Sequence, residues 1–194
     1  NFAAHEFKTP LTVIKAYSQA LLKNEDRDEK SLKGLKTIER QANNLNSIVK
    51  TYLETSRKGN LKPQLNLAPS NLSELVQEVI ETIEISQRSH TIFSYIAENV
   101  IIQSDKQKLR QVIVNYLTNA IKFSPAATKV EVRLERYDGK VRFTVTDFGL
   151  GIDPKNQELI FDKRYRVKGA QDIDGSGFGL YICAQIIEIH QGEI

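Results

Sequence analysis

The sequence predicts an α+β protein in which a two-helix hairpin dimerises into a four-helix bundle and is followed by an α/β sandwich. Three observations support this prediction. Apolar residues recur at helical spacing up to about residue 57, a polar stretch with glycine and proline follows, and helical and alternating segments are mixed beyond it. We therefore expect a dimerisation domain at 1–57, a linker at 58–66 and a second domain at 67–194.

The N-terminal hairpin is expected from two helical stretches on either side of a nearly all-polar turn at 23–30. The second stretch places apolar residues at alternating gaps of three and four, namely Leu35, Ile38, Ala42, Leu45, Val49 and Tyr52. Two antiparallel helices bury their apolar faces poorly, so we expect two copies to form a homodimer. The alternative that stays open is a hairpin packed against its own second domain.

Capping and turn signals divide the second domain into elements. Asn71 followed by Glu74 predicts a helix through about residue 86, and Asp105 predicts another through about residue 123. Strands are expected at 91–96 and 100–103, and a last helix at about 178–190. Alternating apolar residues at 130–134 and 141–145, separated by Asp138-Gly139, predict a β-hairpin.

The composition excludes several classes of protein. The chain has 27 basic and 24 acidic residues, a net charge of +3 and 40% hydrophobic residues, which indicates a soluble globular chain without a nucleic-acid partner. Cys183 is the single cysteine, so an intramolecular disulfide and a cysteine zinc cluster are excluded, and we expect it in the core. We expect a cytoplasmic fragment without membrane contact, because no apolar run is long enough to span a membrane and the chain starts without Met.

A first group of reactive residues lies at the start of the first helix, in the order His5, Glu6, Thr9 and Pro10. A neutral imidazole is a nucleophile, and an adjacent carboxylate can take or orient its ring proton. Pro10 removes the helical partner of the Glu6 carbonyl, so the helix can bend beside the histidine. The alternative is a surface histidine in a proline-kinked helix. A zinc protease is excluded because position 9 is threonine.

A second group, Asn115, Asn119 and Lys122, is spaced by four and three residues and therefore shares one helix face. Two amides and an ammonium group suit phosphate oxygens and a hard cation such as Mg²⁺. The alternative is the polar outer face of an amphipathic helix.

A third group combines a carboxylate with two glycine-rich segments. Asp147, Gly149 and Gly151 follow a strand, and we expect Asp147 to be a buried acceptor for an exocyclic amine such as that of adenine. A second cluster opens the last helix, where backbone N–H groups can approach an anion, and comprises Gly175, Gly177, Gly179 and Leu180. The alternative is that these glycines serve only turns and helix caps. The order of segments excludes a serine/threonine kinase, and the polar residues before Gly175 exclude a Rossmann fold.

Taken in order, these segments resemble the sensor histidine kinases of two-component systems over essentially the whole chain. The segment from His5 to Leu11 resembles the H box, 115–122 the N box, 147–151 the first glycine box, 160–167 the F box and 175–180 the second glycine box. The resemblance implies a phosphotransfer hairpin followed by a catalytic domain with the fold of gyrase, Hsp90 and MutL ATPases. It also implies ATP and Mg²⁺ as cofactors.

The resemblance also implies roles for individual residues. His5 is the expected phosphoacceptor, Glu6 its base and Thr9 the residue that orients water in a phosphatase reaction. The residues expected to bind nucleotide are Asn115, Asn119 (which would also hold Mg²⁺), Lys122, Asp147, Gly149, Gly151, Tyr165, Arg166, Gly175, Gly177, Gly179 and Leu180. The expected partners are a second copy and the receiver domain of a response regulator, and the parent protein is expected at the plasma membrane.

Two rival functions remain open at this point. One is an enzyme that acts mainly as a phosphatase of its regulator, and the other is a silent dimeric scaffold that senses nucleotide. Arg164 departs from the family pattern, since the F box commonly has an aromatic residue there. The resemblance also implies that the final strands of the second domain are missing, since the family usually continues with a strand pair beyond residues 191–194.

Overall fold

A computed structural model describes residues 11–18, 21, 31, 34–35, 37–38, 42, 45, 65–87, 89–163, 165–167 and 177–194. The chain divides into two compact units, Asn1–Gln64 and Leu65–Ile194, which we describe separately.

The described residues of the first unit between 11 and 45 are all helical. A Cβ atom added to the buried Gly34 would lie 3.3 Å from the side chain of Leu21, so the two predicted helical stretches approach each other there. Of the expected apolar seam, Leu35 is exposed whereas Ile38 and Leu45 are half-buried. The expected turn at 23–30, Val49 and Tyr52 lie outside the described residues.

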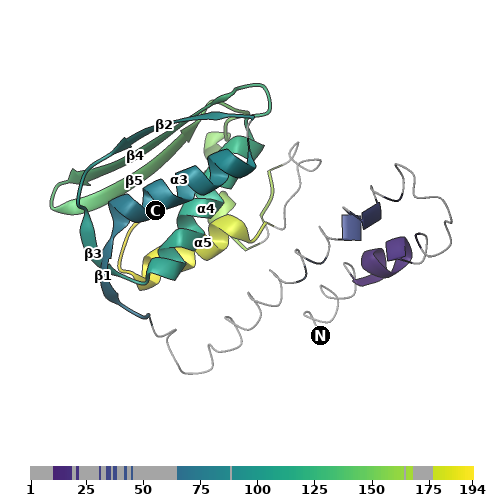
Figure 1. Ribbon diagram of the computed structural model, residues 1–194, viewed down its shortest axis with the longest axis horizontal. Coiled ribbons are helices and arrows are strands. Elements are labelled where there is room, and N and C mark those ends of the chain that lie inside the picture. Colours follow the sequence, from purple (N-terminus) through teal and green to yellow (C-terminus); the bar gives the residue numbers. More distant parts are fainter. Residues whose placement is uncertain are drawn as a thin grey trace. The chain divides into compact units, whose positions relative to one another are not determined.

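The second unit is an α/β sandwich (Figure 1). Its elements are β1 (Ala68–Asn71), α3 (Leu72–Ser86), β2 (Thr91–Ile96), β3 (Ile101–Ser104), α4 (Lys106–Lys122), β4 (Lys129–Tyr137), β5 (Lys140–Asp147) and α5 (Gly179–Ile189). Short 3₁₀ turns at Pro154–Asn156 and Leu159–Phe161 lie between β5 and α5. In the main sheet β2 pairs in parallel with β4, and β4 pairs antiparallel with β5. Helices α3, α4 and α5 all lie on one side of this sheet, with α5 packed against α4 (Figure 1).

Capping side chains start the two long helices where the sequence predicts them. The side chain of Asn71 accepts from the N–H groups of Ser73 and Glu74, and its amide donates to the Glu74 carboxylate over 2.9 Å. Asp105 accepts from the second and third N–H groups of α4, each over 3.1 Å. The β4–β5 turn is also confirmed, with positive φ at Asp138 (49°) and Gly139 (71°), as a tight hairpin requires.

Strand β1 was not predicted from the sequence. It pairs antiparallel with β3, from Ala68 opposite Ser104 to Asn71 opposite Ile101. The segment has no apolar alternation and contains Pro69, which is tolerated because β1 is an edge strand. Its pairing depends on a partner strand 30 or more residues away, which local pattern does not encode.

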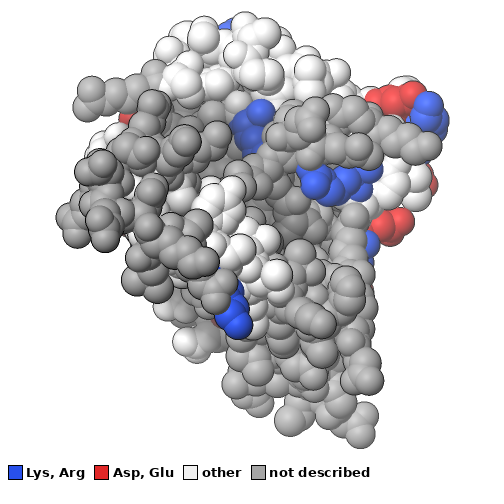
Figure 2. Space-filling model, turned by 90° about the vertical axis from the view of Figure 1, so that its right-hand side faces the viewer, with Lys and Arg blue, Asp and Glu red and all other residues white. Residues whose placement is uncertain are grey.

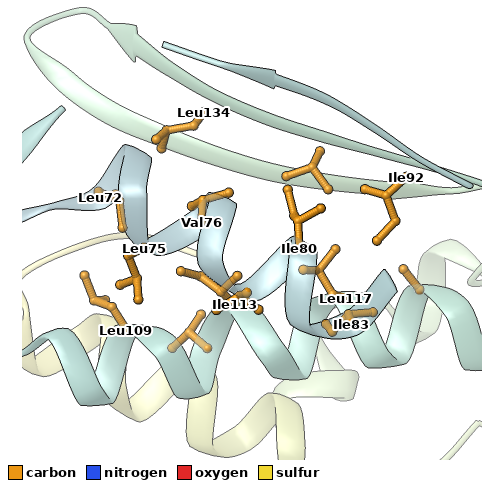
Figure 3. Packing of buried hydrophobic residues seen from close by; sticks show 14 of the residues in the cluster. Leu72, Leu75, Val76, Ile80, Ile83, Ile92, Leu109, Ile113, Leu117 and Leu134 are labelled. Carbon is orange, nitrogen blue, oxygen red and sulfur yellow. The ribbon is translucent and has the colours of Figure 1, made fainter. Parts of the chain in front are cut away.

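The hydrophobic core lies between the main sheet and α3 and between α3 and α4 (Figure 3). Leu134 and Ile92 point from the sheet toward α3, and Leu117 points from α4 toward α3. Leu75, Leu117 and Val132 have no exposed surface. Each such side chain stabilises the fold by about 1.5–3 kcal/mol relative to exposure. This core holds α4 in place, and α4 carries the polar residues of the site.

Candidate nucleotide-binding site

Helix α4 presents the predicted polar residues on one face. Asn115, Asn119 and Lys122 are half-buried, whereas Leu117 and Ala120 on the other side are buried in the core. The amide of Asn119 donates to Oδ1 of Asn115 over 3.1 Å. This bond turns Oδ1 of Asn119 away from Asn115, and no described residue donates to that oxygen. A free amide oxygen beside an ammonium group suits a hard cation and its phosphate ligands.

The start of α5 lies directly against Asn115. A Cβ atom on Gly179 would lie 2.5 Å from Oδ1 and 2.7 Å from Nδ2 of Asn115, so only glycine fits without displacing that side chain. Gly177, two residues earlier, has φ of 70°, which also favours glycine. The side chain of Phe178 at the N-cap of α5 forms no capping hydrogen bond, and the N–H groups at the start of a helix favour an anion. The second glycine segment therefore meets the polar face of α4, with Leu180 half-buried beside it.

The end of β5 approaches the C-terminal end of α4. A Cβ atom on Gly149 would overlap the carbonyl oxygen of Phe123 and lie 2.7 Å from Oγ of Ser124. The N–H of Leu150 donates to the same Phe123 carbonyl over 3.1 Å. Gly151 is needed for its backbone conformation, with φ of 68° and open space around it.

Asp147 is exposed, which corrects the expectation of a buried carboxylate. Its position continues the inward alternation of Val141, Phe143 and Val145, but it is the last residue of the edge strand β5 and lies beside the turn at Gly149. Oδ1 of Asp147 accepts from the N–H of Gly149 over 3.0 Å. The carboxylate is therefore held through Oδ1 by the backbone and is otherwise exposed to solvent.

The F-box segment contributes a different kind of residue. Tyr165 is half-buried, and its hydroxyl donates to Oδ1 of Asn156 over 2.8 Å. Arg166 is exposed. Arg164 and residues 168–176, which include the expected site residue Gly175, lie outside the described residues, as do His5, Glu6 and Thr9.

Two residues beside the site were not assigned a role from the sequence. Ser124 has no exposed surface and lies two residues after the end of α4, and Nε2 of His90 bonds to its carbonyl oxygen. No motif indicates this pair, because the contact joins residues 34 positions apart.

Lys122 and the exposed Arg166 are described basic residues of the site segments, and they favour an anionic ligand. On the face shown in Figure 2, the described acidic side chains lie at the margins, whereas Lys and Arg side chains also lie further in. Among the described residues, no group of three or more His, Cys, Asp and Glu side chains could hold a metal ion by itself. Burial raises the pKa of the Cys183 thiol to about 12, so Cys183 is an uncharged core residue, as predicted.

Comparisons with known proteins agree with this arrangement. The family described as "Histidine kinase-, DNA gyrase B-, and HSP90-like ATPase" matches residues 104–194, and the "His Kinase A (phospho-acceptor) domain" family matches residues 1–61. The adaptive-response sensory kinase SasA of Synechocystis sp. is 32% identical over 201 residues, which cover 98% of this chain and 52% of that protein. The chain thus spans about half the length of the curated relatives it matches.

Solved structures give the same result. The catalytic domain of histidine kinase ThkA is 30% identical with a TM-score of 0.56, covering 64% of this chain and 83% of that one. ThkA in complex with the response regulator protein TrrA gives 26% identity and a TM-score of 0.68, over 97% of this chain and 53% of that one. Full-length ShkA in complex with AMPPNP is 26% identical with a TM-score of 0.65, and the match covers 95% of this chain and 39% of that one. With both family matches in the order that the motifs predict, the chain belongs to the sensor histidine kinases of two-component systems.

Proposed function

We propose that this chain is the ATP-dependent transmitter of a two-component system, which phosphorylates His5 and passes the phosphoryl group to an aspartate of a response regulator. The observation that carries the proposal is that two sequence-distant segments meet α4. Gly179 lies against Asn115, and Gly149 lies against Phe123 and Ser124, without room for a Cβ atom at either glycine. Such close backbone approach brings N–H groups, amides and a carboxylate to one place.

The nucleotide contacts follow from the chemistry of each group. Asp147 accepts from the exocyclic amine of adenine, because its carboxylate is anchored on one oxygen and exposed to solvent. Lys122, Arg166 and Tyr165 serve the phosphates, together with the backbone of the second glycine segment at Gly175, Gly177, Gly179 and Leu180. The first glycine segment, at Gly149 and Gly151, forms the part of the site next to adenine.

Mg²⁺ fits the residues present, because this ion commonly takes one or two protein oxygens and completes its shell with phosphates and water. Asn119 offers the oxygen, since its Nδ2 is already occupied by Asn115. When bound, the ion neutralises charge on the phosphate oxygens.

In the transfer step, a ring nitrogen of neutral His5 forms a bond to the γ-phosphorus while the bond from that phosphorus to the bridging oxygen of ADP breaks. Glu6 takes or orients the proton on the other ring nitrogen. An amide is a poor base, so Asn115 does not activate water, and transfer to histidine is favoured over hydrolysis. In the second step the P–N bond breaks as a regulator carboxylate forms a P–O bond.

A second activity is proposed from the same segment. Thr9 and Glu6 match the family pattern for dephosphorylating the regulator, with Thr9 orienting the attacking water. ThkA, a structural relative, is solved in complex with a response regulator protein.

Dimerisation through the hairpin is supported by its apolar surface. Leu11 and Leu35 are 51% and 56% exposed in one chain, which a second hairpin would cover. We place the dimerisation domain at 1–57, the linker at 58–66 and the catalytic domain at 67–194. No described helix has the length and hydropathy to cross a membrane. Membrane anchoring of the parent protein is a proposal that rests on the family resemblance.

Incubation with γ-labelled ATP and Mg²⁺ tests the function. We expect acid-labile, base-stable label on the chain, and its loss in His5→Gln with ADP binding unchanged. His190→Gln is the matched control and should keep the label, because the imidazole of His190 bonds only to backbone atoms of Ile186 and Asp105 among the described residues. Label that survives His5→Gln would contradict the assignment of the phosphoacceptor, and nucleotide binding without label would favour the scaffold.

A further inference from the structure

The two oxygens of the Asp147 carboxylate have different surroundings. Oδ1 accepts from the N–H of Gly149 over 3.0 Å and lies 3.4 Å from the hydroxyl oxygen of Ser124. No described residue donates to Oδ2. The carboxylate is therefore oriented through Oδ1, which leaves Oδ2 for a ligand.

Ser124 lies behind this carboxylate with no exposed surface. Its hydroxyl donates to the carbonyl of Ala120 over 2.7 Å and can turn its single proton toward Asp147. The carbonyl of Ser124 accepts from the N–H of Ala127 over 3.2 Å and from Nε2 of His90 over 2.9 Å. Ser124 thus joins the end of α4 to the carboxylate through its side chain and to the start of β2 through its backbone.

His90 is fixed on both ring nitrogens. A carbonyl oxygen only accepts, so Nε2 of His90 carries a proton and donates to Ser124, while Nδ1 is 2.9 Å from Oγ of Ser89. His90 immediately precedes β2, whose first N–H, at Thr91, donates to the carbonyl of Thr128 over 2.6 Å. The imidazole therefore ties Ser124 to the main sheet.

We propose that Ser124 and His90 are positioning residues, which act through Asp147 to set the preference of the site for a purine with an exocyclic amine. The inference rests on the proposed function, in which Asp147 accepts a hydrogen bond from the exocyclic amine of adenine. Loss of the Ser124 hydroxyl, or of the His90 donor, lets the carboxylate and the Gly149 turn shift. A misplaced acceptor then distinguishes poorly between an amine and a carbonyl at the same purine position.

The experiment measures the dissociation constants of ADP and IDP, with Mg²⁺, by titration calorimetry on the full chain. IDP has a carbonyl where ADP has the amine, and neither nucleotide can phosphorylate His5. The readout is the ratio of the IDP constant to the ADP constant. A general loss of stability weakens both nucleotides together and leaves this ratio unchanged.

We expect Asp147→Asn to lower the ratio by about 10- to 100-fold, and Ser124→Ala and His90→Phe to lower it by about 2- to 10-fold. His90→Gln keeps a side-chain N–H donor and should restore most of the ratio. The matched controls are Ser104→Ala, which removes another buried serine hydroxyl, and His190→Phe. Both should leave the ratio unchanged.

The outcomes separate the two proposals. If Asp147→Asn lowers the ratio but Ser124→Ala and His90→Phe do not, the positioning inference is wrong and the adenine role of Asp147 stands. If Asp147→Asn leaves the ratio unchanged, the adenine assignment fails and this inference fails with it. Equal losses in the controls would show a general packing effect and would also overturn the inference.

Discussion

The two faces of α4 serve different purposes although they share one backbone. One face buries Leu109, Ile113 and Leu117 against α3 and the sheet, and the other presents Asn115 and Asn119 at the site. The buried face tolerates little change in volume, because interiors are closely packed. The site face is half-buried and depends on glycines from two other segments. Stability and nucleotide binding should therefore respond to different substitutions in one helix.

The largest expected effect is on the buried face. Leu117→Ala should lower the free energy of unfolding by about 2–5 kcal/mol, because Leu117 has no exposed surface and its removal leaves a cavity. Denaturant unfolding measures this loss. Val114→Ala, on the 38% exposed Val114 of the same helix, is the matched control and should change stability by about 0.5 kcal/mol or less. Comparable losses at the two positions would contradict the division between the faces.

Gly179→Ala, in α5, tests the site face of α4 because Gly179 lies against Asn115. The added Cβ would lie 2.5 Å from Oδ1 of Asn115, so we expect about tenfold weaker ADP binding and a stability loss of about 1–3 kcal/mol from crowding. Gly139→Ala is the control, because Gly139 has φ of 71° and open space around it. It should cost about 1 kcal/mol of stability without any change in ADP binding. Unchanged binding in Gly179→Ala would show that the Asn115 contact is dispensable.

Cys183 tests the core through pH. Burial raises the pKa of its thiol from 9.0 to about 12, so the unfolded chain loses this proton first. Stability from this group is fully present below pH 9 and is lost as the pH rises toward 12, by at most about 1.4 kcal/mol per pH unit. Cys183→Ala should flatten the decline. Tyr116, whose pKa burial raises to about 12, should leave a residual slope above pH 10. If stability declines with pH equally steeply in wild type and in Cys183→Ala, the thiol is not buried as described.

The contrast between the two faces also explains what the sequence could predict. Helical spacing placed Asn115 and Asn119 together, the caps at Asn71 and Asp105 located the helix starts, and Asp138-Gly139 located a turn. These features depend on neighbours within a few residues. The exposure of Asp147, the pairing of β1 and the contact of His90 with Ser124 depend on segments brought together by folding, so local pattern does not encode them.

We propose that ATP bound at the site around Asp147 is the source of the phosphoryl group on His5. A titration of ATP against acid-labile label on the chain, in wild type and in Asp147→Asn, tests it most directly. We expect the same plateau of label in both proteins, with half-saturation of the variant shifted to at least tenfold higher ATP. Superimposable curves for the two proteins would contradict the claim.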